Sequence, residues 1–126
     1  MLLKKFLDNV NYNISYGQSF DWKAYGDNAR YMDCQNIIDS NQVISCVFDT
    51  KKLIVYEITI YKINSFIRWI DPLYLKNIKN EYKNKGINFN SALDNSLWYN
   101  INSEQDILME VRDTFRCYGH NKFNTP

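Results

Sequence analysis

Residues Gln42–Asp71, QVISCVFDTKKLIVYEITIYKINSFIRWID, form the only long and densely apolar stretch of the chain, and they decide its fold. β-Branched and aromatic side chains dominate this stretch, and such side chains favour a pleated strand over a helix. Two polar breaks, Asp49–Lys52 and Lys62–Asn64, divide it into three runs. Strands joined by such short connections pair antiparallel, because a parallel pair needs a long crossover. The stretch therefore predicts a three-stranded meander.

Alternation in the middle run sorts its side chains onto two faces. One face carries Ile54, Tyr56, Ile58 and Ile60, and the other carries Leu53, Val55, Glu57, Thr59 and Tyr61. The first face is the more apolar, so we predict that it points into the core. Glu57, on the second face, is then expected to point towards solvent.

Helices are predicted on both sides of the meander. Apolar side chains at helical spacing predict a short helix over residues 2–10. A second helix is expected from the N-cap Asp71 to Gly86, where a left-handed residue belongs. Ser103–Asp106 resembles a capping box and predicts the start of a third helix, which we expect to stop at Tyr118–Gly119.

Short strands complete the predicted fold, at Ser19–Ala24, Ala29–Gln35 and Leu97–Ile101. Runs of strands followed by helices indicate the α+β class. We therefore predict an antiparallel meander sheet, covered on one face by an N-terminal helix and two C-terminal helices. The chain of 126 residues contains no linker, so residues 1–126 are expected to form a single domain with a frayed tail from His120.

Composition excludes several classes of protein. The net charge of +1 gives no general basic excess for nucleic acid or a membrane surface. No apolar run is long enough to span a bilayer, and the N-terminus lacks the pattern of a signal peptide. Cys34, Cys46 and Cys117 are an odd set at wide spacing, which favours a reducing compartment. We therefore expect a cytoplasmic protein.

The residue types that carry chemistry form no convincing site. Cys117 and His120 have half the spacing of a zinc site, but Cys46 lies among core residues and no C-x-x-C pair exists. His120 is the only histidine, and no nucleophile or orienting partner lies nearby in the sequence. No catalytic residue, metal or cofactor is predicted, and the chain is not expected to be an enzyme.

A row of lysines on the second helix offers one alternative function. The row consists of Lys76, Lys79, Lys83 and Lys85, interrupted by Glu81. A solvated helix face is the more common meaning of such a row. A small nucleic-acid-binding protein or nuclease therefore stays open as an alternative.

The aromatic content favours a protein-binding role. A core of this size cannot easily bury ten tyrosines and three tryptophans, and Tyr, Trp and Arg are enriched at interface centres. Arg68 and Trp69 point to opposite faces of their strand, so we expect only one of them in the core. The predicted partner-binding residues are Arg68, Trp69, Tyr74, Trp22 and Tyr25. The alternative is a core in which Trp69 packs under a helix and tyrosine hydroxyls reach solvent.

Four segments carry a resemblance to a known group of proteins. They are Phe48–Asp49, Val55–Ile58, Arg68–Pro72 and Asp106–Leu108. The pattern resembles small uncharacterised accessory proteins of tailed bacteriophages. That resemblance implies a protein of the infected bacterial cytoplasm that inhibits a host defence or host metabolic protein by binding it. A toxin-neutralising immunity protein is the alternative among binding modules.

Overall fold

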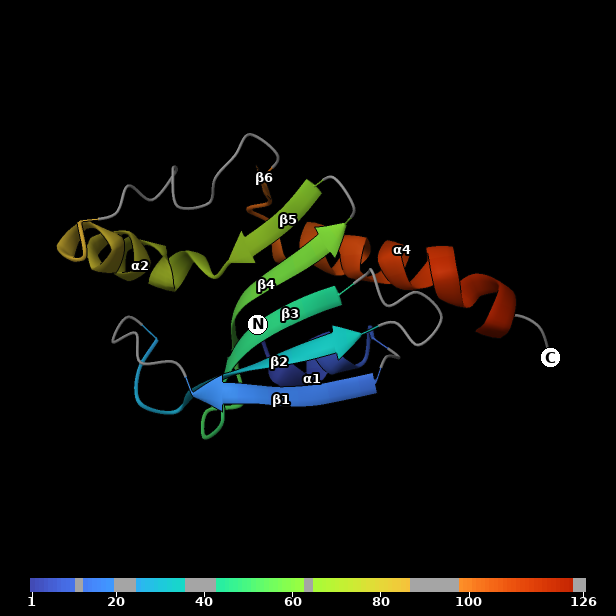
Figure 1. Ribbon diagram of the computed structural model, residues 1–126, viewed down its shortest axis with the longest axis horizontal. Coiled ribbons are helices and arrows are strands. Elements are labelled where there is room, and N and C mark those ends of the chain that lie inside the picture. Colours follow the sequence, from blue (N-terminus) through green and yellow to red (C-terminus); the bar gives the residue numbers. More distant parts are fainter. Residues whose placement is uncertain (11–12, 20–24, 36–42, 63–64, 87–97, 124–126) are drawn as a thin grey trace.

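The computed structural model describes residues 1–10, 13–19, 25–35, 43–62, 65–86 and 98–123 (Figure 1). The order of elements is α1 (Leu3–Leu7), β1 (Asn13–Ser19), β2 (Ala29–Gln35), β3 (Val43–Asp49), β4 (Val55–Lys62), β5 (Ser65–Ile70), α2 (Pro72–Asn84), β6 (Trp98–Asn100) and α4 (Glu104–Phe123). The α+β class and the three-stranded meander are confirmed. The strand expected at Ser19–Ala24 lies outside the described residues, except that Ser19 ends β1.

The strands form one sheet in chain order, β1-β2-β3-β4-β5-β6. Neighbours from β1 to β5 pair antiparallel, whereas β6 pairs parallel to β5 over Phe66–Arg68. The long connection through α2 makes this parallel pairing possible. Because β6 pairs with it, β5 is not an edge strand.

Helices cover both faces of the sheet, so the expectation that all helices share one face is wrong. Phe6 of α1 and Ile107 of α4 pack in one cluster with Ile58. Ile78 of α2 packs in a second cluster with Tyr56 on the opposite face. Figure 1 shows α1 and α4 behind the strands. A second covered face lets this small sheet bury side chains from both sides of its central strands.

A β-bulge in β4 changes which side chains share a face. Val47 pairs with Glu57 and Phe48 pairs with Val55, so Tyr56 is an extra residue in the ladder. Strict alternation predicts Tyr56 on the face of Ile58, but the bulge turns it to the α2 face. Tyr56 is buried as predicted, but it and Ile54 pack on the opposite face from Ile58 and Ile60. The bulge also places two consecutive residues, Tyr56 and Glu57, on the α2 face.

The β3–β4 hairpin is organised by one buried carboxylate. Asp49 is 3% exposed, and its Oδ1 accepts hydrogen bonds from the backbone N–H groups of Lys51 and Lys52, both at 2.8 Å. Its Oδ2 accepts a 2.7 Å hydrogen bond from the hydroxyl of Tyr56. Burial alone would raise the pKa of Asp49, but these three hydrogen bonds and the charge of Lys52 lower it.

The ends of the longer helices match the sequence, with one exception. Asp71 caps α2 by accepting a hydrogen bond from the N–H of Leu73 at 3.0 Å, and Gly86 follows the helix with φ +72°. Ser103 caps α4 by accepting from the N–H of Asp106 at 3.2 Å. The predicted stop at Tyr118–Gly119 is wrong, because α4 continues to Phe123. One glycine inside a helix costs only about 1 kcal/mol, which does not force an end.

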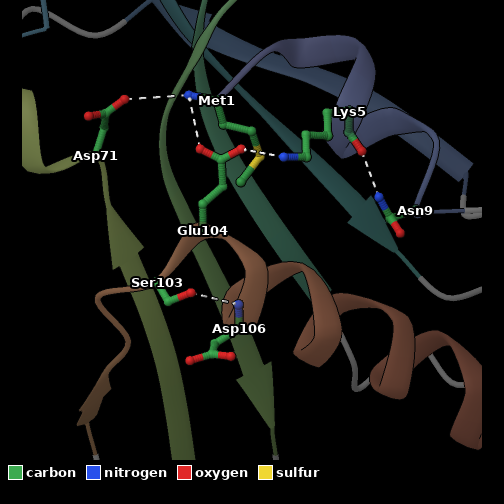
Figure 2. Close-up of polar contacts among 7 residues, drawn as sticks. All are labelled: Met1, Lys5, Asn9, Asp71, Ser103, Glu104 and Asp106. Carbon is green, nitrogen blue, oxygen red and sulfur yellow. Dashed lines mark hydrogen bonds and ion pairs between the residues drawn. The ribbon is translucent and has the colours of Figure 1, made fainter.

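The first helix is shorter than expected, and its start is tied to α2 and α4. It spans Leu3–Leu7 rather than residues 2–10. The ammonium group of Met1 lies 3.4 Å from Asp71 Oδ2 and 3.9 Å from Glu104 Oε2 (Figure 2). Lys5 donates a 2.8 Å hydrogen bond to Glu104 Oε1. These contacts join the beginnings of α1, α2 and α4.

Candidate functional site

The two central residues of the predicted partner-binding set are both buried. Trp69 is 1% exposed and packs in the cluster on the α1 and α4 face. Arg68 is 4% exposed and belongs to the opposite face. The expectation that only one of the pair can be buried is wrong, because both faces of β5 are covered. Trp69 is therefore a core residue, which was the alternative to a role in partner binding.

Two further residues of that set, Tyr74 and Tyr25, belong to the cluster beneath α2. Tyr74 is half-buried and packs edge-on against Tyr56, with ring centroids 4.6 Å apart. Tyr25 is 4% exposed and packs in the same cluster. Trp22 lies outside the described residues. The rings of Tyr74 and Tyr25 therefore help to hold α2 against the sheet.

The lysine row is exposed along α2 at all four positions, Lys76, Lys79, Lys83 and Lys85. Lys79 also lines a cavity of about 170 Å³ together with Arg68, Leu75 and Asn100. No described residue brings a second row of basic side chains beside this face. Nucleic-acid binding by these lysines stays a prediction.

The α2 face of the sheet carries a groove that the sequence did not reveal. We call it the tyrosine groove. Its inner pocket has a volume of about 150 Å³ and is lined by Tyr25, Ser45, Val47, Glu57, Thr59, Tyr61 and Tyr82. Its outer part, of about 460 Å³, is lined by Tyr31, Asp33, Val43, Ser45 and Tyr61. Ser45 and Tyr61 line both parts, so the two lie side by side on the sheet.

Glu57 is the polar centre of the inner pocket. Alternation with Ile58 places it on the α2 face, where it is half-buried rather than fully in solvent as expected. The hydroxyl of Tyr25 donates a hydrogen bond to its Oε2, and the hydroxyl of Thr59 donates one to its Oε1 at 3.2 Å. In the outer part, Asp33 Oδ1 accepts a 2.8 Å hydrogen bond from Ser45.

The negative charge of Glu57 acts on the tyrosines around it. Burial, followed by the charge of Glu57, raises the pKa of Tyr25, Tyr61 and Tyr82. Burial lowers the pKa of Arg68, while the charge of Glu57 opposes that change. All three tyrosine hydroxyls therefore stay protonated at ordinary pH and can donate hydrogen bonds into the pocket.

The groove brings together residues that are far apart in the sequence. Its tyrosines come from β2, β4, α2 and the turn before β2, and its two carboxylates come from β2 and β4. A spacing of two links the lining residues within each strand, such as Glu57 and Tyr61, but no sequence pattern links β2, β3, β4 and α2 to one another. Among the described residues, no group of three or more His, Cys, Asp or Glu side chains is arranged to hold a metal ion.

A comparison with models of known protein families finds no match, and neither do comparisons with curated proteins and with solved structures. Along the part of the chain that the structure describes, no helix combines the length and apolar character needed to cross a membrane. The tyrosine groove is thus the feature from which a function can be argued.

Proposed function

We propose that this protein is a binding module that acts by contacting another protein, and that the tyrosine groove is the centre of its contact surface. The observation that carries the proposal is the gathering of four tyrosines around one groove on the sheet: Tyr25, Tyr31, Tyr61 and Tyr82. Tyrosine supplies a large contact area and a hydrogen bond at a low cost in side-chain entropy, and it is enriched at interface centres.

The groove differs from an ordinary packed surface in its polar content. Asp33, Ser45 and Glu57 place hydrogen-bonding groups among the rings. Binding pockets are typically lined by apolar and aromatic side chains with a few convergent polar groups that fix orientation. Tyr61 is 36% exposed and lines both parts of the groove, so it is the ring best placed to touch a partner.

The resemblance to phage accessory proteins gives this proposal its specific form, an inhibitor of a host defence or host metabolic protein. Such a protein needs no catalytic site, because it acts by occupying a surface of its target. A toxin-neutralising immunity protein would use the same kind of groove, and the identity of the captured partner distinguishes the two.

The test is groove-dependent capture from bacterial lysate. Immobilised wild-type protein and the Tyr61→Ala and Tyr31→Ala variants are compared, and bound proteins are identified by mass spectrometry. Leu73→Ala is the matched control, because Leu73 is an 82% exposed apolar residue on α2 outside the groove. Truncating an aromatic residue at an interface centre costs about 2 kcal/mol, or roughly thirtyfold in affinity.

A partner held by wild type and by Leu73→Ala but lost by both tyrosine variants supports the proposal. Equal capture by all four proteins refutes the groove as the contact surface. Capture that disappears after nuclease treatment and weakens steeply with salt would favour the nucleic-acid alternative instead. In that case Lys79→Ala, and not Tyr61→Ala, should reduce binding.

A further inference from the structure

The inner pocket of the tyrosine groove has the composition of a cation-binding cage. Tyr25, Tyr61 and Tyr82 supply its aromatic walls, and Glu57 supplies a carboxylate between them. Aromatic rings attract cations through the negative face of the ring, and this attraction strengthens when water is excluded. Guanidinium groups also pair with carboxylates through directed hydrogen bonds.

The charge around the groove is locally negative on a chain that is nearly neutral. The chain carries a net charge of +1, yet the groove is lined by the carboxylates of Asp33 and Glu57. Of its described lining residues, none is lysine, arginine or histidine. Arg68 acts electrostatically on Glu57 but lines the neighbouring cavity instead. The charged groups among the described lining residues of the groove are therefore two carboxylates.

The dimensions of the groove favour a side chain carried on a polypeptide over a free small cation. The inner pocket, at about 150 Å³, has the volume of about five water molecules at roughly 30 Å³ each. That volume fits the charged end and part of the stem of a long basic side chain. The outer part, at about 460 Å³, adjoins it at Ser45 and Tyr61 and leaves room for the backbone that carries such a side chain.

We propose that the inner pocket binds a lysine or arginine side chain of the partner protein, with the charged group beside Glu57 and the stem between the tyrosine rings. This inference rests on the proposed function and names the chemistry of the partner at that site. Glu57 would supply the charge and Tyr61 the exposed contact. Asp33, at the outer end, would favour a second basic residue nearby in the partner.

The first experiment needs no identified partner. ¹⁵N-labelled protein is titrated with N-acetyl-lysine methylamide, with the corresponding arginine compound, and with the neutral glutamine compound as the control. Shifts are expected at the amides of Ser45, Thr59 and Tyr61 with the two cations but not with the glutamine compound. In Glu57→Gln the affinity should fall at least tenfold. Asp8→Asn removes one charge at an exposed position just after α1 and should change nothing.

A second experiment separates this inference from the proposed function. The lysate used for capture is treated with a lysine-acetylating reagent or with an arginine-specific dicarbonyl before it meets the immobilised protein. Loss of the partner after either treatment, together with loss in Glu57→Gln, supports the inference. Capture that survives both treatments and Glu57→Gln, but not Tyr61→Ala, overturns the inference while leaving the proposed function intact.

The remaining outcomes are also decisive. If Glu57→Gln melts at a much lower temperature than wild type, Tyr61→Ala replaces it in the titration, because Tyr61 is partly exposed. Equal shifts with the glutamine compound refute the cation preference. Saturable binding of the cations without any groove-dependent protein capture points to a free small cation as the ligand, and refutes both the partner side chain and the proposed function.

Discussion

Asp49 offers the sharpest test of how this fold is held together, because one carboxylate serves three hydrogen bonds at 3% exposure. Asp49→Ala removes all three. The N–H groups of Lys51 and Lys52 lie in an exposed turn and can bind water instead. The hydroxyl of Tyr56 cannot, because Tyr56 is 2% exposed. The main cost of the substitution is therefore expected at Tyr56.

The magnitude follows from these three bonds. A hydrogen bond to a charged group contributes about 1.5–3 kcal/mol, and an unpaired buried hydroxyl costs about 1–3 kcal/mol. Asp49→Ala should then lower the free energy of unfolding by about 3–5 kcal/mol. Asp49→Asn keeps an acceptor for the turn and should cost about 1–2 kcal/mol. Tyr56→Phe removes one charged hydrogen bond without leaving a donor unpaired, so about 1.5–3 kcal/mol is expected.

The assay is urea unfolding of Asp49→Ala, of Tyr56→Phe and of the double variant that combines them. Residues in one hydrogen-bond network are not additive, so the double variant should cost less than the sum by about 1 kcal/mol or more. If the two losses of unfolding free energy simply add, and the slope of that free energy against urea concentration is unchanged, the coupling between Asp49 and Tyr56 is refuted. Such a result would leave the turn amides as the only role of Asp49.

The same network predicts two pH dependences of opposite sign. The folded pKa of Asp49 lies below its ordinary value of 3.8, so its contribution is present above that value and is lost as pH falls further. Burial and the hydrogen bond to Asp49 raise the pKa of Tyr56 above its ordinary value of 10.0. Its contribution is therefore present below pH 10.0 and is lost as pH rises beyond it. In a plot of unfolding free energy against pH, Asp49→Asn should reduce the loss of stability at acid pH, and Tyr56→Phe should reduce the loss at alkaline pH.

Further predictions address the core, the thiols and metal. Ile58→Asp places a carboxylate at a position that is 0% exposed and should cost several kcal/mol; a soluble variant that melts like wild type would contradict the assigned face. Trp69→Ala should cost about 3 kcal/mol or more by thermal unfolding, since Trp69 is 1% exposed. Burial raises the pKa of the Cys34 thiol to about 12 and also raises that of Cys46, so iodoacetamide should modify both only after denaturation, as read by peptide mass spectrometry. A chelator should leave the melting temperature unchanged, and stoichiometric bound zinc with unfolding by chelator would show otherwise.

The strands and helices were predictable where one local signal dominates. The polar breaks and β-branched runs of Gln42–Asp71 correctly gave three strands. The cap at Asp71 and the glycine at Gly86 correctly bounded α2. The end of α4 was misjudged, because Gly119 favours a stop only weakly against the remainder of the helix. Local sequence signals thus predicted where the longer helices begin better than where they end.

The bulge at Tyr56 explains why the buried network of the hairpin was not predictable in the same way. A period of two assigns every other residue to one face, and one extra residue reverses that assignment on one side of it. Here the extra residue places Tyr56 on the α2 face, where its hydroxyl bonds Asp49. Glu57 lies on the same face, where it accepts a hydrogen bond from Tyr25. Without the extra residue, alternation would turn either Tyr56 or Glu57 to the opposite apolar face. The buried hairpin network therefore depends on this irregularity. Alternation does place Glu57, Thr59 and Tyr61 on one face, but it misses that α2 packs on that face.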